Sequence, residues 1–527
     1  MNELAGTGAL VRAHLHRDRL RIAVWIGSIV GLVAAATSSV KALYPTRADL
    51  DAAARAAQDS AVAKAFKGPA QALDTIGGQV AFQIVVFGIV AVALMSLLTV
   101  VRLTRAEEEA GRLELLRALP VGRRAPLAAA LVVVAGMDVA VGALVTVALL
   151  AYGLPAGGSA VIGVSFAVVG FVFAAIAAVT AQVTENARVA AGIAGGALAV
   201  AFVLRAIGDV GDGTVSWLSP IGWAQKARPY AGEQWWPLLL AVVTAAVLVP
   251  VAVRLLDHRD LDAGLLPARA GPATAASWLA SVWALALRLQ RGGLLWWGLG
   301  VLLLAVGYGS ITGSIDDFVS GNQTMQDVIA RGPGSLVDSF LATSLLILAL
   351  VTAGFAVQAV GRLRTEESSG RAETLLATPT PRSRWAGSHL AIAFGGSAVV
   401  LVAGGVGLGL LAGLTTSDLG QLPRVALAAL AYVPPVWILA AIAAALFGLA
   451  PQWTALAWAP LAVCLVIGMF GTLLDLPAAV LDLSPFEWTP SVPAAGWDVV
   501  PVLVLTAVGA GVVAVGLATF KRRDLTT

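Results

Sequence analysis

The sequence predicts an all-α integral membrane protein with about twelve transmembrane helices, arranged as two homologous six-helix halves in the same orientation. The composition is 58% hydrophobic and 12% charged residues, against about a quarter charged in a typical soluble domain. The apolar residues form separate stretches, each near the ~20 residues that cross a bilayer as a helix. A water-soluble fold is therefore excluded, and several spans are expected.

Each apolar stretch predicts one span. The predicted spans lie near residues 22–43, 80–101, 126–152, 160–181, 188–207, 237–256, 294–313, 339–360, 388–414, 423–449, 453–474 and 499–520. The first stretch follows a polar, basic segment, so a cleaved signal peptide is the alternative for it. A similar basic and then apolar unit recurs in mid-chain, which favours a retained span.

Arginines concentrate in alternate loops of this arrangement. The positive-inside rule then predicts a multi-pass protein of the cell membrane with both termini cytoplasmic. The arginines on the predicted inner side include Arg12, Arg17, Arg102, Arg105, Arg123, Arg254, Arg288, Arg362, Arg382 and Arg522.

Three segments of the first half recur in the second, about 260 residues later. The segment from Arg105 to Arg123 matches that from Arg364 to Arg382, the outer segment LSPIGW matches LSPFEW, and each half ends its last span in Arg-Asp-Leu. We therefore expect a first six-span half at 1–256, a cytoplasmic linker at 257–291 and a second six-span half at 292–527.

The repeated loop after the second span of each half predicts a short cytoplasmic helix, at about 102–120 and about 361–379. At 3.6 residues per turn, two acids and a glycine share one stripe in each helix. These residues are Glu107, Gly111 and Glu114 in the first half, and Glu366, Gly370 and Glu373 in the second. Because glycine costs about 1 kcal/mol in a helix, its presence in both halves suggests that a partner approaches the backbone closely.

The second acid of each loop has a different predicted role. Glu108 with Arg112, and Glu367 with Arg371, have the four-residue spacing of helix-stabilising ion pairs. A solvated pair on the helix surface explains both.

The sequence offers no catalytic or metal site of its own. No nucleotide-binding loop of the form GxxxxGK[ST] occurs, and the single cysteine, Cys464, lies in an apolar span. The four histidines lack metal-ligand spacing and are expected at solvated helix ends. The net charge of +3, without a basic stripe, gives no sign of a nucleic-acid partner.

One carboxylate is expected deep inside a span. Asp138 falls near the middle of the third predicted span. An ionisable residue at that depth is costly and usually faces a polar interior or cavity. A hydrogen-bonded structural acid and a contact with substrate or a proton are the two alternatives.

With these motifs the chain resembles ABC-2-type exporter permeases, and in particular the fused twelve-span actinobacterial permeases for polyketide antibiotics and multiple drugs, of the tetronasin type. The resemblance implies that the repeated loop is a coupling helix docking into a separate ATPase, through Glu107, Glu108, Gly111, Arg112 and Glu114 and their second-half counterparts. It also implies an interfacial helix around Arg12 to Arg21. The halves differ, since Leu115 corresponds to Thr374.

The resemblance further implies a permease subunit that exports hydrophobic or amphiphilic small molecules. Its partners would be the lipid bilayer and two copies of a cytoplasmic P-loop ATPase, which would bind ATP and Mg²⁺, with no cofactor in this chain.

Two alternatives come from other classes. A secondary transporter of the major facilitator type also has six plus six helices, but its loop after the second span is short, whereas the loop here is long and acidic. A membrane scaffold is the other.

Overall fold

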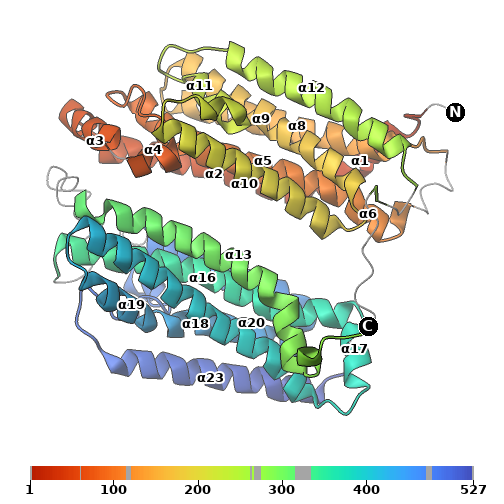
Figure 1. Ribbon diagram of the computed structural model, residues 1–527, viewed down its shortest axis with the longest axis vertical. Helices are drawn as coiled ribbons and strands as arrows, with labels where there is room; N and C mark the ends of the chain where they lie inside the picture. Colours follow the sequence, from red (N-terminus) through yellow and green to blue (C-terminus); the bar gives the residue numbers. More distant parts are fainter. Residues whose placement is uncertain are drawn as a thin grey trace. The chain divides into compact units, whose positions relative to one another are not determined.

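The computed structural model describes residues 3–59, 61–113, 120–260, 264–265, 274–314, 334–470 and 477–524, and within these ranges the chain is helical and forms no strand. It divides into two compact units, residues 1–271 and 272–527 (Figure 1). The division falls inside the segment predicted as the linker.

Unit 1 contains the first six spans and several shorter helices. Its elements are α1 (Thr7–Arg17), α2 (Arg19–Leu43), α3 (Arg47–Asp59), α4 (Ala61–Lys67), α5 (Ile76–Leu103), α6 (Arg105–Glu109), α8 (Ala125–Ala151), α9 (Ala156–Val183), α10 (Ala187–Val210), η1 (Val215–Leu218), α11 (Pro220–Lys226) and α12 (Trp236–Asp257).

Unit 2 contains the remaining spans. Its elements are η2 (Ser277–Leu279), α13 (Val282–Ile311), η3 (Thr312–Ser314), α16 (Leu336–Ser368), α17 (Arg371–Leu376), α18 (Arg382–Thr415), α19 (Gln421–Ala431), α20 (Val433–Leu449), η4 (Pro451–Ala457), α21 (Trp458–Phe470), α22 (Ala478–Leu481) and α23 (Val499–Arg522).

The described residues contain 12 helices that are long and apolar enough to cross a membrane, and each overlaps one predicted span. The predicted fold class is thereby confirmed. One boundary differs clearly, because α13 begins at Val282, inside the predicted linker. The hydroxyl of Ser281 accepts a hydrogen bond from the Ala284 backbone N–H, and this cap starts the helix earlier than the apolar pattern alone indicates.

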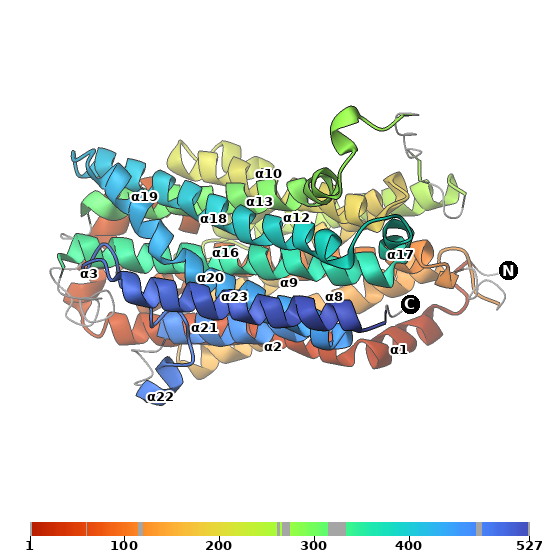
Figure 2. The ribbon, with the colours of Figure 1, turned by 90° about the horizontal axis from the view of Figure 1, so that it is seen from below.

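From the second span to the fifth, burial follows the same order in both units. The second span is the most buried, with 72% of its most apolar stretch buried in unit 1 and 83% in unit 2. The first and sixth spans lie at the periphery. In unit 1, α8 and α9 pack along each other and α12 packs on α9 (Figure 1), and in unit 2, α23 packs on α20 (Figure 2). Each second span therefore forms the centre of its unit, and its extension positions the loop that follows it.

The repeated segments LSPIGW and LSPFEW form the same contact in each unit. The indole N–H of Trp223 donates to the Trp217 carbonyl at 2.6 Å, and that of Trp488 donates to the Asp482 carbonyl at 3.0 Å. The tryptophan in both cases reaches the residue six positions earlier. This bond closes the turn before the sixth span, which explains why both segments contain a tryptophan at that position.

Candidate functional site

Both loops break their helix at the glycine. In unit 1 α6 ends at Glu109 and Gly111 has φ +70°; in unit 2 α16 ends at Ser368 and Gly370 has φ +72°. Residues with a Cβ rarely adopt this left-handed backbone conformation, whereas a Cβ built on either glycine would have no neighbouring atom within 4 Å. The predicted continuous stripe through the glycine is therefore wrong for the described residues, and the backbone conformation itself requires glycine. Glu114 and the rest of 114–119 lie outside the described residues.

The first acid of each loop is buried and paired within its own unit. Glu107 is 8% exposed and accepts hydrogen bonds from Arg17 at 2.9 Å and Arg112 at 2.6 Å. Glu366 is 2% exposed and pairs with Arg362 and Arg371, each at 2.8 Å.

These contacts correct the predicted ion pairs. Arg112 and Arg371 were expected to pair with Glu108 and Glu367, four residues earlier, and pair instead with the first acids, five residues earlier. The glycine turn between acid and arginine removes the regular helical spacing and folds each arginine back over the first acid.

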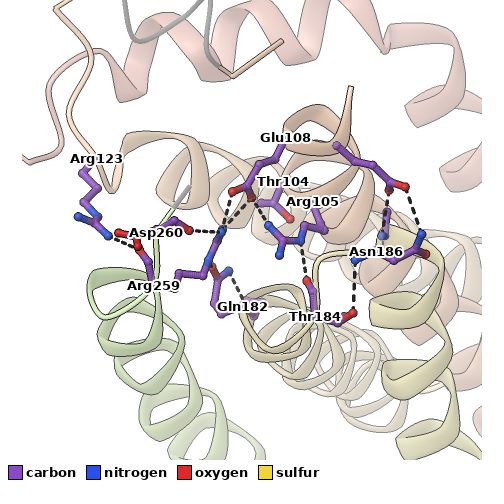
Figure 3. A network of polar contacts seen from close by, with 12 residues as sticks. Thr104, Arg105, Glu108, Arg123, Gln182, Thr184, Asn186, Arg259 and Asp260 are labelled. Atoms are coloured by element: carbon purple, nitrogen blue, oxygen red, sulfur yellow. Dashed lines mark hydrogen bonds and ion pairs between the residues drawn. The ribbon is translucent and has the colours of Figure 1, made fainter. Parts of the chain in front are cut away.

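The second acid of each loop pairs with the arginine that follows the sixth span. Glu108 accepts two hydrogen bonds from the Arg259 guanidinium, at 2.6 and 2.7 Å (Figure 3). Glu367 accepts the same two from Arg523, also at 2.6 and 2.7 Å. We call these two contacts the loop-to-span ion pairs. A two-pronged arginine–carboxylate contact adds geometric specificity to its charge.

Unit 1 holds its pair in a wider polar network. Arg105 contacts Glu108 at 2.8 Å and donates to the Thr184 carbonyl at 2.6 Å, while the Nε of Arg259 donates to Gln182 at 2.8 Å (Figure 3). These contacts bring the ends of the second, fourth and sixth spans to one point.

The third acid of the first loop caps another span. Glu109 accepts from the Asn186 side chain at 3.2 Å and from the Ala187 backbone N–H at 3.0 Å, at the start of α10. An acid at a helix N-terminus meets unpaired N–H groups and the positive end of the helix dipole. The loop is thus fixed to the fifth span as well.

The N-terminal helix α1 is attached to this loop. Asp18, which follows α1, pairs with Arg102 at 2.7 Å, and Leu10 packs on Ala125 and Ala129 of α8. Burial opposes ionisation of Asp18, but hydrogen bonding and charge from Arg102 outweigh it and lower the pKa of that carboxyl. A helix in the predicted interfacial segment is therefore present, and it is bound to the unit on one face.

The short helix α17 of the second loop carries exposed side chains. The Arg371 side chain is 51% exposed, and Glu373 and Thr374 are exposed next to it. Of the predicted docking residues in the described part of unit 2, Gly370, Arg371 and Glu373 are thus accessible, whereas Glu366 and Glu367 are not.

Asp138 lies inside unit 1, 1% exposed, at a contact of three spans. Its Oδ1 lies 2.6 Å from the hydroxyl of Ser96 on α5, and a Cβ on Gly170 of α9 would meet the same oxygen at 2.9 Å. This tight helix contact favours the structural alternative for Asp138.

The expectation of solvated histidines is wrong for two of the four. His389 is 2% exposed, and its Nδ1 accepts a hydrogen bond from the side-chain amide of Gln290 at 3.0 Å. His14 is 9% exposed and lies close to Arg17 and Glu107. His16 and His258 are exposed as expected. The described residues bring no three His, Cys, Asp or Glu side chains into a metal-binding group.

Sequence reasoning missed the arginines that pair with the second acids. The Arg-Asp-Leu repeats were visible, but an arginine 151 residues from Glu108, or 156 from Glu367, gives no local signal of contact. The usable signal was the joint repetition of acid and arginine in both halves.

Fold and site together define a multi-pass membrane protein whose loops are held by polar clusters at the ends of its spans. A family model described as the C-terminal domain of the multidrug efflux system permease Rv1217c matches residues 279–521. The multidrug efflux system permease protein Rv1217c of Mycobacterium tuberculosis is 42% identical over 525 residues, covering 99% of this chain and 95% of the relative. The chain belongs to this family of multidrug efflux permeases and is a transport protein rather than an enzyme.

Proposed function

We propose that this chain is the membrane subunit of an ABC-2-type exporter, close to the tetronasin type, which moves hydrophobic or amphiphilic compounds such as polyketide antibiotics and drugs out of the cell. Two copies of a separate P-loop ATPase would bind ATP and Mg²⁺ and drive it. The relative from Mycobacterium tuberculosis is named a multidrug efflux system permease, which supports efflux, and the duplicated loop supports the ATPase partner.

The observation that carries the proposal is that the exposed helix α17 follows directly on a rigid segment, in which Glu366 and Glu367 are held by buried ion pairs. Buried ion pairs hold Glu366 and Glu367, and Gly370 then turns the chain so that Arg371 and Glu373 are exposed. Docking of a partner is strongest when the docking element loses little conformational freedom on binding. The buried ion pairs of Glu366 and Glu367 restrict the conformational freedom of the loop before the partner binds.

This reassigns the predicted docking residues. Glu107, Glu108, Glu366 and Glu367 position the loop, because each is buried and ion-paired within its own unit. Contact with the ATPase then falls to the residues beyond the glycine, with Glu373 as the acid in the described part of the chain.

The arginine asymmetry supports an orientation with both termini and both loops in the cytoplasm. Substrate would enter from the cytoplasm or the inner leaflet and leave outward, as ATP-driven movement of the loops alternates access to the two sides.

The test is copurification of a coexpressed P-loop ATPase subunit from the same organism with the tagged permease. Glu373→Arg should lower the amount retained on the tagged permease, because it reverses the charge on the exposed face. Glu233→Arg, at an exposed acid in the loop before α12, is the matched control and should retain the wild-type amount. Equal retention by both variants would remove the assignment of α17 as the docking element.

A further inference from the structure

We propose that the loop-to-span ion pairs carry the displacement of each loop to the sixth span of the same unit, so that Glu108 and Glu367, with Arg259 and Arg523, are positioning residues for transport. This inference rests on the proposed function and concerns what happens after the ATPase has docked. It assigns a role to the Arg-Asp-Leu repeats that end the two units.

The same ion pair occurs in both units, in different surroundings. In unit 1 the Arg259 guanidinium is also held by Gln182 at 2.8 Å. In unit 2 the Arg523 guanidinium instead lies over the rings of Phe447 and Phe520, at 5.0 and 5.2 Å from their centroids. The surroundings of the arginine differ between the units, yet both ion pairs keep two short hydrogen bonds. This indicates that both units require the connection between the loop and the sixth span.

The backbone of each of these two arginines is held by a hydrogen bond as well. Arg123, at the far end of the first loop, donates to the Arg259 carbonyl at 2.6 Å, and Arg382 donates to the Arg523 carbonyl at 2.6 Å. Each sixth-span terminus is therefore bound from both sides of its loop. A force on the loop reaches the sixth span through side chain and main chain together.

Both carboxylates are buried, because Glu108 and Glu367 are 4% and 2% exposed, and a buried carboxylate is costly without a cationic partner. In unit 1, Arg105 also contacts Glu108, at 2.8 Å. The link therefore cannot open and close as freely as a surface ion pair. The sixth spans to which the loops are linked are peripheral, since α12 packs chiefly on α9 and α23 on α20, rather than on the central second spans.

The experiment compares two double variants in proteoliposomes with the ATPase bound. Arg259→Gln with Arg523→Gln removes both links, and Arg254→Gln with Arg522→Gln removes the same charge from exposed arginines near the same helix ends. The first should retain more ATPase than Glu373→Arg does, since α17 itself is unchanged, and the bound complex should export at least about tenfold less drug per ATP hydrolysed, because one charge-assisted ion pair is lost in each unit. The second should behave as wild type.

Two further variants keep the inference falsifiable if the first fails to fold. Arg259→Lys with Arg523→Lys keeps the charges but not the two-pronged contact, and should give an intermediate export ratio with normal folding. Exchanging the partners, Glu108→Arg with Arg259→Glu, should restore part of the ratio lost in the single changes.

The outcomes separate the inference from the proposed function. Wild-type export per ATP in the Arg→Gln double variant, or loss of ATPase retention equal to that of Glu373→Arg, would overturn the positioning role. Failure of the wild-type permease to retain any ATPase would instead refute the proposed function.

Discussion

Replacement of Gly370 tests whether backbone conformation or partner approach requires the glycine. Gly370 has φ +72° and open space around its missing Cβ, so Gly370→Ala adds no clash within the chain. The left-handed conformation costs an L-residue about 1 to 2 kcal/mol, which raises the population of locally opened α17 by about 5-fold to 30-fold. Asparagine tolerates this conformation better, so Gly370→Asn should cost less than Gly370→Ala.

The assay is amide hydrogen exchange of residues 371–376 in lipid nanodiscs, together with ATPase copurification. Gly387→Ala is the matched control, because Gly387 lies inside helix α18 and also has open space around it, so alanine should not destabilise there. If exchange at α17 does not rise in Gly370→Ala, the conformational reasoning is refuted. If ATPase retention falls more with Gly370→Asn than with Gly370→Ala, the size of the side chain limits docking. A close approach by the partner is then the reason for the glycine.

Three more predictions follow from the structure. In a background without the native cysteine, single cysteines at the exposed residues Asp74 and Asp482 should react with a membrane-impermeant thiol reagent added to intact cells. A cysteine at Glu373 should react only after permeabilisation, and the reverse pattern would invert the topology. Asp138→Asn should keep expression and efflux near wild type, while Asp138→Leu should lower stability by about 1 kcal/mol through loss of the interhelical hydrogen bond; loss of efflux in a stable Asn variant would assign Asp138 to transport. Burial, and then the charge of Arg17, lower the pKa of His14, so His14 takes up a proton more readily when α1 is detached than when it is packed. Amide hydrogen exchange in α1 should therefore rise as pH falls from about 7.5 to 5.5. The His14→Gln variant should lose this pH dependence.

The spans could be predicted because a helix in lipid must satisfy its backbone internally and present apolar side chains over a fixed length. That requirement acts on each stretch separately, so it is visible without tertiary information. The repeated loop was visible for a similar reason, since its residues are adjacent in sequence. The start of α13 was not, because the cap at Ser281 precedes the apolar pattern.

The partners in the site could not be predicted from local spacing. The regular helical rule pairs Glu108 with Arg112, but the turn at Gly111 brings Arg112 to Glu107 and leaves Glu108 to an arginine at the end of α12. A glycine at a position that looks helical is compatible with close approach by a partner and with a positive φ, and the sequence does not distinguish them. Whether a histidine near a span end is solvated also depends on its neighbours in space, as His389 shows.

The central claim is that a separate ATPase drives export through this permease, and reconstituted transport tests it most directly. Purified permease is placed in proteoliposomes with and without the P-loop ATPase subunit that copurifies with it, and uptake of a fluorescent amphiphilic drug into inside-out vesicles is measured. The account predicts transport only with both the ATPase and Mg-ATP, unaffected by a protonophore. Transport by the permease alone, driven by a proton gradient and abolished by the protonophore, would contradict it and favour a secondary transporter.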